Sequence, residues 1–398
     1  MHIVGGTYIE RVLDHNWQEL FGSGLRACCV LPRSTNINYY TYIGPDYLNA
    51  LEYKTTEFKI NLTQKVVIPK TISFQYLTSL SEPLIVDLPL NVKEVIEIKS
   101  EEAVLRYGMM ERDAICHGNR VVYDPQSPNR PQPYYANGST AKELAVIMNH
   151  QEASLLSGGD NPNKLFENES TKIIIIKNGP QGALLYHRSG NILSIPSYMT
   201  ETVFSVGSGD VFSAFFTYFW AEKGEDPCDS ALKASKAVAL YVSSNGALSQ
   251  IDESLIEGFN EPLVPANIKS IEKKIYLAGP FFTLSDRWFV EEALRHFTAM
   301  EISVFSPFHD IGIGCAEKVY SADIEGLKSC DVIFANLCGL DVGTIYEIGY
   351  ARACGKPVVV FIQNYKKENL TMVIGGDCKI FEDYTSAVYN AVWEALKT

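Results

Sequence analysis

The chain reads Asp331-Val332-Ile333-Phe334-Ala335, a strand-like run, and then Asp341-Val342-Gly343-Thr344-Ile345-Tyr346-Glu347-Ile348-Gly349-Tyr350-Ala351. The second stretch reads as a short loop that enters a helix ending near Gly355-Lys356-Pro357. In an open parallel sheet, ligands lie beyond the carboxyl ends of the strands. A carboxylate in the first turns of the next helix, here Glu347, points into that crevice. A structural alternative stays open, because Thr344-x-x-Glu347 also fits a capping box.

The surrounding sequence repeats the same order of strand and helix. Strand-like runs lie at 275–278, 302–305, 332–335 and 358–362, and helical patterns lie between them. One of these helices carries Phe289, Ala293, Leu294 and Phe297 on a single face, as an amphipathic helix requires. Residues 270–398 are therefore predicted to form a small flavodoxin-like (Rossmann-like) parallel-sheet domain.

Four ionisable residues of this domain are expected to converge. Tyr276 ends the first strand, Asp323 lies in the helix before the third, and Asp341 and Glu347 follow the third. Strand ends and the loops beyond them share one edge of a parallel sheet. Each residue alone has a structural explanation: Tyr276 as a core aromatic, Asp323 as an exposed helix charge, Asp341 as an N-cap. Together they indicate one site.

The first part of the chain also alternates strand and helix, which predicts an α/β layer fold. Strand-like runs occupy 84–88, 120–124 and 172–176, and the last is continuously apolar after its lysine, as buried parallel strands are. The run Val206-Gly207-Ser208-Gly209-Asp210 then opens a strongly apolar helix. Backbone amides that the glycines leave free at a helix N-terminus can bind an anion, and Asp210 is placed to take a proton from a hydroxyl. A plain Gly-Asp turn that caps a core helix is the alternative.

Composition limits the classes of partner. The 398 residues suit two or three domains, and their formal net charge of -13 disfavours a nucleic-acid backbone. The nine Cys have no metal-ligand spacing and predict reduced thiols of a cytoplasmic protein. No apolar run reaches the length of a membrane span. Spaced prolines between about 247 and 272 predict a linker between the domains.

The motifs of residues 273–381 resemble those of the nucleoside 2-deoxyribosyltransferase family. They are Tyr276-x-Ala278-Gly279-Pro280-Phe281, Tyr320-x-x-Asp323, and Asp341-x-Gly343-Thr344-x-x-Glu347-x-Gly349-Tyr350-Ala351. Asn369-Leu370 falls where that family has an Asn that reaches a neighbouring subunit's site.

This resemblance implies a reaction like that of a retaining glycosidase, with a glycosyl-enzyme on Glu347. Tyr276 would orient Glu347, and Asp323 would protonate the leaving base. The implied substrate-binding residues are Asp341, Gly279, Phe281, Gly343 and Asn369. The implied partners are nucleosides, free bases or sugars in a homo-oligomer, with no cofactor required for this step.

Residues 1–265 resemble the ribokinase-like (phosphofructokinase B, PfkB) family, which has an α/β/α sandwich fold. Gly207-Ser208-Gly209-Asp210 corresponds to its anion hole and catalytic Asp, and Asn149-x-x-Glu152 to its magnesium- and phosphate-ordering motif. The turn from Gly179 to Gly182 corresponds to its nucleotide-contacting glycines, and Gly44-x-Asp46 to an early sugar-side motif. The resemblance implies Mg-ATP as cofactor if the domain is active; no metal ligand is assigned.

Two departures keep the activity of this domain open. The substrate loop lacks the family's Asn and reads Gly22-Ser23-Gly24-Leu25-Arg26-Ala27. No stretch stands out as the small β lid, so a lidless domain is predicted, and a lidless kinase would struggle to exclude water. An active kinase and an inactive binding or scaffolding domain are both retained.

The leading hypothesis is N-glycosidic bond cleavage or transfer on a nucleoside by the second domain, coupled to a kinase-like domain that binds or phosphorylates a nucleoside or sugar. One alternative makes a PfkB-type kinase the main activity. In another, a nucleotide-sensing kinase-like module gates a nucleotide- or NAD-depleting effector. The base, the choice between transfer and hydrolysis, and the oligomeric state are left open.

Overall fold

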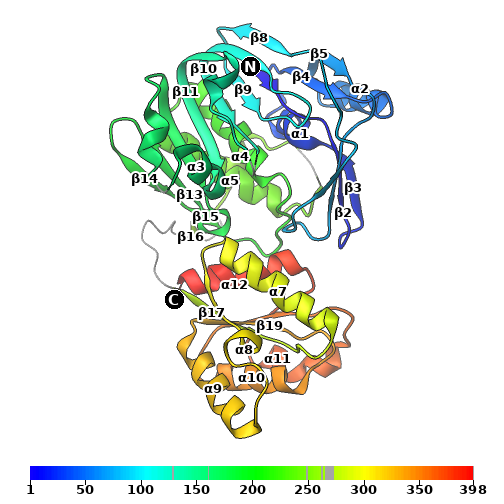
Figure 1. Ribbon diagram of the computed structural model, residues 1–398, viewed down its shortest axis with the longest axis vertical. Helices are drawn as coiled ribbons and strands as arrows, with labels where there is room; N and C mark the ends of the chain where they lie inside the picture. Colours follow the sequence, from blue (N-terminus) through cyan, green and yellow to red (C-terminus); the bar gives the residue numbers. More distant parts are fainter. Residues whose placement is uncertain (128–129, 160, 248–249, 261–262, 265–272, 398) are drawn as a thin grey trace. The chain divides into compact units, whose positions relative to one another are not determined.

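The computed structural model describes residues 1–398 except 128–129, 160, 248–249, 261–262, 265–272 and 398 (Figure 1). The chain separates into two compact units. Unit 1 is Met1–Thr200 with Phe204–Ala266, and unit 2 is Glu201–Val203 with Asn267–Thr398. Much of the predicted linker, namely 248–249, 261–262 and 265–272, lies outside the described residues.

A ten-stranded sheet forms the centre of unit 1 and runs in the order β14-β13-β12-β11-β10-β9-β1-β4-β5, with β8 paired to β10. The pairs are parallel except those of β12 with β13 and β13 with β14. The apolar run predicted as a buried strand is β12, and its isoleucines are buried. The strands are β1 (His2–Val4), β4 (Asn38–Ile43), β5 (Asn61–Val67), β8 (Glu97–Ser100), β9 (Val104–Tyr107), β10 (Ile115–Asp124), β11 (Thr140–Asn149), β12 (Thr171–Lys177), β13 (Ala183–His187) and β14 (Ile192–Ile195).

Helices pack against this sheet because their apolar faces need cover. The predicted apolar helix is α4, and all of its residues from Asp210 to Phe216 are buried. It contacts α1 and α5, and its glycine-rich start is half-buried. The helices are α1 (Gly22–Val30), α2 (Leu48–Glu57), α3 (His150–Ser157), α4 (Ser208–Phe216), α5 (Pro227–Val242) and α6 (Glu253–Gly258).

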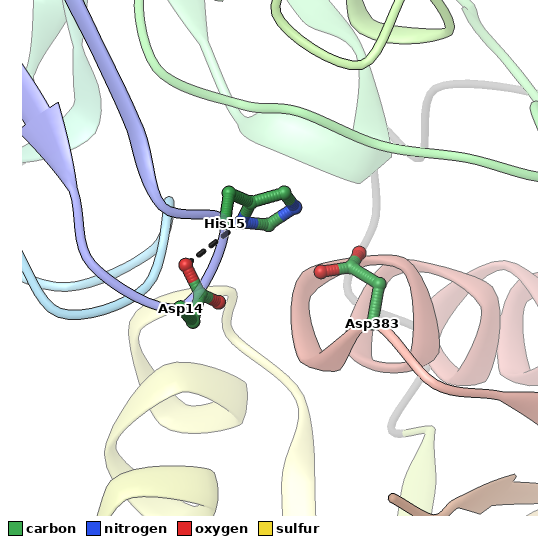
Figure 2. A group of neighbouring side chains, drawn as sticks. All are labelled: Asp14, His15 and Asp383. Carbon is green, nitrogen blue, oxygen red and sulfur yellow. Dashed lines mark hydrogen bonds and ion pairs between the residues drawn. The ribbon is translucent and has the colours of Figure 1, made fainter.

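Unit 1 also has a separate four-stranded sheet in the order β3-β2-β6-β7, called the small sheet below. The prediction of a domain without a small β lid is therefore wrong. Its strands are only three or four residues long, and β2 and β3 mix charged with apolar residues, so a periodic signal is weak; only β7 falls in a predicted strand-like run, 84–88. At the turn between β2 and β3, a 2.7 Å hydrogen bond joins His15 to Asp14 (Figure 2). The strands are β2 (Ile9–Val12), β3 (Trp17–Leu20), β6 (Ser73–Tyr76) and β7 (Leu84–Val86).

Unit 2 is built on a five-stranded sheet in the order β18-β17-β19-β20-β21. All of its pairs are parallel, as the sequence predicted. The last strand was not predicted, because three residues are too few for a periodic signal. The strands are β17 (Lys274–Ala278), β18 (Ser303–Phe305), β19 (Val332–Asn336), β20 (Val358–Phe361) and β21 (Lys379–Phe381).

Helices cover both faces of this sheet (Figure 1). The helices α7 (Leu284–Ala299) and α12 (Tyr384–Lys397) contact one another and lie on one face. The helices α9 (Ala316–Ser329) and α10 (Val342–Ala353) lie on the other, beside the short α8 (Pro307–Asp310) and α11 (Thr371–Gly375). Asp383, labelled in Figure 2, accepts a 2.6 Å hydrogen bond from the amide of Ser386 at the start of α12. Within the described residues, no helix has the length and apolarity needed to cross a bilayer.

Candidate active sites

The start of α10 sets the position of Glu347. Asp341 is the N-cap of this helix, and its Oδ2 accepts hydrogen bonds from the amide of Thr344 at 2.8 Å and from its hydroxyl at 2.9 Å. Thr344 is thus inside the helix, and the capping-box explanation of Thr344-x-x-Glu347 is wrong. Glu347 lies in the second turn instead, where its Oε1 accepts a 2.6 Å hydrogen bond from the hydroxyl of Tyr276.

Tyr276 lies on β17, an inner strand between β18 and β19, at which the order of the sheet reverses. Its side chain is 0% exposed, and its ring stacks on Phe305 with centroids 5.5 Å apart and an interplanar angle of 11°. In sheets of this type such a reversal point opens the ligand crevice. Packing therefore fixes the hydroxyl that contacts Glu347.

The electrostatics of Glu347 show which charges share its surroundings. Burial raises the pKa of Glu347 to about 7, the hydrogen bond from Tyr276 lowers it, and the charges of Asp323 and Asp341 raise it. Charges shift a carboxyl pKa in this way only when they are nearby. The structure thus brings together the four residues that the sequence placed in one site.

Asp323 lies on α9 and differs from Glu347 in its hydrogen bonding. Its Oδ1 is buried and has no hydrogen-bond partner among the described residues. Burial raises the pKa of Asp323, which favours the protonated carboxyl. A protonated carboxyl can donate a hydrogen bond or a proton to a bound ligand.

The predicted substrate-binding residues have different surroundings. A Cβ on Gly279 would lie 3.2 Å from that of Asn336, and one on Gly343 would lie 3.1 Å from Oδ2 of Asp341. Phe281 packs against Phe308 with ring centroids 5.4 Å apart. Asn369 is exposed and lines a different pocket of about 270 Å³, whose lining excludes Glu347 and Tyr276. The structure does not bring Asn369 to that pair.

In unit 1, Asp210 lies in the first turn of α4 and is buried. Gly207 is the N-cap with a φ of 79°, a left-handed conformation that suits glycine. Oδ2 of Asp210 accepts a 3.0 Å hydrogen bond from Arg26, and Oδ1 accepts one from Gln126. Burial raises the pKa of Asp210 to about 6, although the charge of Arg26 lowers it.

The other predicted phosphate-side residues lie at the start of α3. Asn149 and Glu152 form a complete capping box, in which each side chain accepts from the other's amide at 2.8 and 3.0 Å. Burial raises the pKa of Glu152, and the charge of Asp124 raises it further. Asp124 in turn accepts a 2.8 Å bond from Lys177, whose ammonium would lie 3.0 Å from a Cβ on Gly209. Ser208, the first residue of α4, is half-buried.

In the glycine turn after β12, the backbone passes close to the backbone around Ile195. Gly179 and Gly182 both have positive φ, 51° and 85°. A Cβ on Gly182 would lie 2.2 Å from the carbonyl oxygen of Ile195, so only glycine fits there. This turn has a structural role whatever it binds.

Two family models match separate parts of the chain. Residues 111–254 match the pfkB family carbohydrate kinase, and residues 275–379 match nucleoside 2-deoxyribosyltransferase. The chain joins a PfkB-type domain to a deoxyribosyltransferase-type domain. Both resemblances drawn from the motifs are confirmed.

Curated relatives match the PfkB-type part. The 5-dehydro-2-deoxygluconokinase of Listeria monocytogenes serovar 1/2a is 24% identical over 240 residues, which is 56% of this chain and 68% of the relative. The protein of the same name from Bacillus licheniformis is 31% identical over 171 residues, which is 40% of this chain and 50% of the relative.

A solved structure shows the same fold in the PfkB-type part. It is a fructokinase double mutant from Vibrio cholerae O395 with fructose, ADP and potassium bound, and it has a TM-score of 0.50. The two chains are 14% identical over 65% of this chain and 98% of that one. The ribokinase-like fold predicted for the first domain is confirmed.

The PfkB-type domain has carboxylates of the kind that magnesium prefers. Glu152 and Asp124 are buried beside Lys177, and these two would hold a magnesium ion that accompanies ATP phosphates. Bound magnesium would offset the charge of the phosphates.

The sequence motifs missed residues that the structure places at both sites. Phe305, which stacks on Tyr276, looks like any core aromatic in sequence. Lys177 ends an apolar strand, and this change of polarity could have pointed to it. Arg26 lies in the substrate loop whose sequence differs from the family pattern. Its partners could not be predicted, because Asp210 is 184 residues away in the sequence.

Proposed function

We propose that the deoxyribosyltransferase-type domain cleaves or transfers the N-glycosidic bond of a nucleoside. The observation that carries this proposal is the 2.6 Å hydrogen bond from Tyr276 to Glu347, in surroundings shared with Asp323 and Asp341. A carboxylate oriented by a rigid donor is the arrangement that a nucleophile needs. The family match supports the same reaction.

The proposed reaction has two steps. A carboxylate oxygen of Glu347 attacks the anomeric carbon, and the bond from that carbon to the base nitrogen breaks. The electron pair of this bond stays on the base, which takes a proton from Asp323. In the second step an acceptor base or water takes the sugar from Glu347, and its proton returns to Asp323.

The charges of the site favour an uncharged nucleoside over a nucleotide. Oδ2 of Asp341 accepts a hydrogen bond from Thr344, and the carboxylate of Asp341 lies near Glu347. A 5′-phosphate close to these carboxylates would be repelled, whereas sugar hydroxyls can donate hydrogen bonds to them.

Replacing Glu347 tests this function directly. The variant Glu347→Gln keeps the size of the side chain but removes the nucleophile, and we expect base release from 2′-deoxynucleosides to fall by at least about 10³-fold, because the covalent step is lost. Glu325→Gln is the matched control, since Glu325 is an exposed residue of α9. Chromatography with an isotopically labelled free base separates exchange from hydrolysis. Undiminished exchange in Glu347→Gln would rule the assignment out.

For the PfkB-type domain, phosphorylation and binding of a sugar or nucleoside are the two alternatives. The family match and the names of the relatives support phosphorylation with Mg-ATP. The contacts of Asp210 support binding, because both of its carboxylate oxygens accept hydrogen bonds from the chain's own side chains.

A further inference from the structure

Arg26 lies on α1 in the interior of unit 1 and is 0% exposed. Its guanidinium donates to both carboxylate oxygens of Glu10, to Oδ2 of Asp210 at 3.0 Å, and to the hydroxyl of Tyr241 at 2.9 Å. A guanidinium has five N–H groups, so these contacts use most of its donors. Arg26 is thus a buried cation whose charge is paired with two carboxylates.

The cluster of Glu10, Arg26 and Asp210, called the charge cluster below, joins three elements. Glu10 lies on β2 of the small sheet, Arg26 on α1, and Asp210 in the first turn of α4. Two further hydrogen bonds hold residues of the cluster and their neighbours in place. Tyr107 donates to the carbonyl oxygen of Asp210 at 2.6 Å, and Tyr241 donates to the carbonyl oxygen of Val206 at 2.8 Å. Few of these groups can move without breaking others.

The guanidinium also occupies the space at the start of α4. A Cβ on Gly207 would lie 2.1 Å from Nε of Arg26, so the cation sits against the backbone at the N-cap. A general base must have an oxygen within about 2.6–3.2 Å of the hydroxyl that it deprotonates. Oδ2 of Asp210 already accepts from Arg26 and Oδ1 from Gln126, so a hydroxyl would have to approach beside these donors.

The charges show that the cluster is not easily opened. Burial alone would lower the pKa of Arg26, but Glu10, Tyr241 and Asp210 raise it well above its usual value. Removing one member of a buried ion pair leaves an uncompensated charge, which is strongly destabilising. An incoming hydroxyl is neutral, and it cannot replace the charge of the guanidinium.

A second group of charged residues lies near the start of α4. Lys177 lies by Gly209 and donates to Asp124, which also accepts from Ser213. Asn149, Glu152 and Gly209, which the motifs assign to phosphate and magnesium, are not members of the charge cluster. Gly207, which the motifs also assign to phosphate, lies against Arg26. The chain's own Arg26 and Gln126 contact the carboxylate that an acceptor would need.

We propose that Glu10, Arg26 and Asp210 form a structural charge cluster that ties the small sheet to α1 and α4 and removes Asp210 from proton transfer. Unit 1 then does not phosphorylate a hydroxyl acceptor, although it has the fold of a kinase. In an enzyme that used Asp210 as its base, Asp210→Asn would lose activity and keep stability. In a structural cluster the same change lowers stability.

The experiment compares thermal unfolding and ATP turnover of the full chain. The variants are Asp210→Asn, Arg26→Met and Glu10→Gln. Their controls are Asp87→Asn and Glu52→Gln, which alter the exposed pairs with Lys70 and Lys65. We expect each cluster variant to lower the midpoint of one unfolding transition by roughly 10 °C. The controls are expected to stay within about 2 °C.

Turnover is measured as ADP release from Mg-ATP with neutral sugars, sugar acids and nucleosides as acceptors. We expect the unaltered protein to release no more ADP with any acceptor than Asp210→Asn does. Acceptor-dependent release that Asp210→Asn abolishes would overturn the proposal, whatever the stabilities. Cluster variants as stable as their controls would also overturn it. If a cluster variant fails to fold, acceptor-dependent ADP release by the unaltered protein still tests the proposal.

Discussion

At the scale of the residue, the bond from Tyr276 to Glu347 has two consequences for catalysis. It orients the carboxylate, and it stabilises the ionised form, because a donor to a carboxylate lowers the pKa of that group. Burial and the charges of Asp323 and Asp341 act in the opposite direction and hold the pKa near 7. A nucleophile has to be ionised, so the balance of these effects sets the working pH.

The pH dependence of base release follows with a definite sign. In the free protein, Glu347 is protonated below its pKa, so kcat/KM is expected to fall as pH drops below about 7. Tyr276→Phe removes the bond that lowers this pKa, so the falling limb should move to higher pH by about one unit. The plateau should fall by about 10- to 100-fold, because a hydrogen bond to a charged group contributes about 1.5–3 kcal/mol. Initial rates between pH 5 and 9 measure both effects. An unchanged limb in Tyr276→Phe would contradict the assigned role of the hydroxyl.

Residues at strand ends were predictable, and residues in the charge cluster were not. Tyr276, Asp341 and Glu347 follow apolar strands of a parallel sheet, whose carboxyl ends meet at one edge. Arg26 and Glu10 carry no such local signal, because their meaning depends on Asp210, which is distant in the sequence. The predicted role of Asn369 concerns the site of a neighbouring subunit, so its position in a different pocket of its own unit leaves that role a prediction. Its assignment came from a motif match in an otherwise dissimilar segment.

At the scale of the element, long apolar patterns predicted structure better than short ones. The strand β12 and the helix α4 were evident from continuous apolar residues. The small sheet was missed because its strands are short and lie far apart between residues 9 and 86; the run that contains β7 was predicted as a strand, but its partners were not. Pairing between distant strands, such as β2 with β6, creates that sheet and leaves no local pattern.

The glycine turn after β12 allows a matched test at this scale. Gly182 and Gly190 both have positive φ, 85° and 95°, but only a Cβ on Gly182 meets backbone, at 2.2 Å from Ile195. Alanine at either position adds about 1–2 kcal/mol of conformational strain. At Gly182 the forced contact adds about 1–3 kcal/mol more. Chemical denaturation should show Gly182→Ala to be clearly less stable than Gly190→Ala. Equal losses would mean that the turn relaxes to admit the side chain.

At the scale of the whole molecule, each unit has its own sheet and its own buried core. The apolar alternation predicted two layered folds because each half restarts with a strand and a glycine turn. The segment Glu201–Val203 belongs to unit 2, and no pattern in the sequence indicated this. Its assignment depends on tertiary contacts, such as the 2.9 Å bond from the amide of Val203 to the hydroxyl of Ser386.

Separate cores predict that the two units unfold in separate transitions. In scanning calorimetry of the full chain, Arg26→Met should lower one transition by roughly 10 °C and leave the other within about 2 °C, because the charge cluster lies entirely in unit 1. A 2′-deoxynucleoside added to Glu347→Gln, which binds without turnover, should raise only the other transition, by mass action on the folded form of unit 2. At a ligand concentration of 100 times Kd the added stability is about 2.7 kcal/mol. A single transition that responds to both changes would show that the two cores unfold as one cooperative unit, and the assignment of the charge cluster and the nucleoside site to independent units would fail.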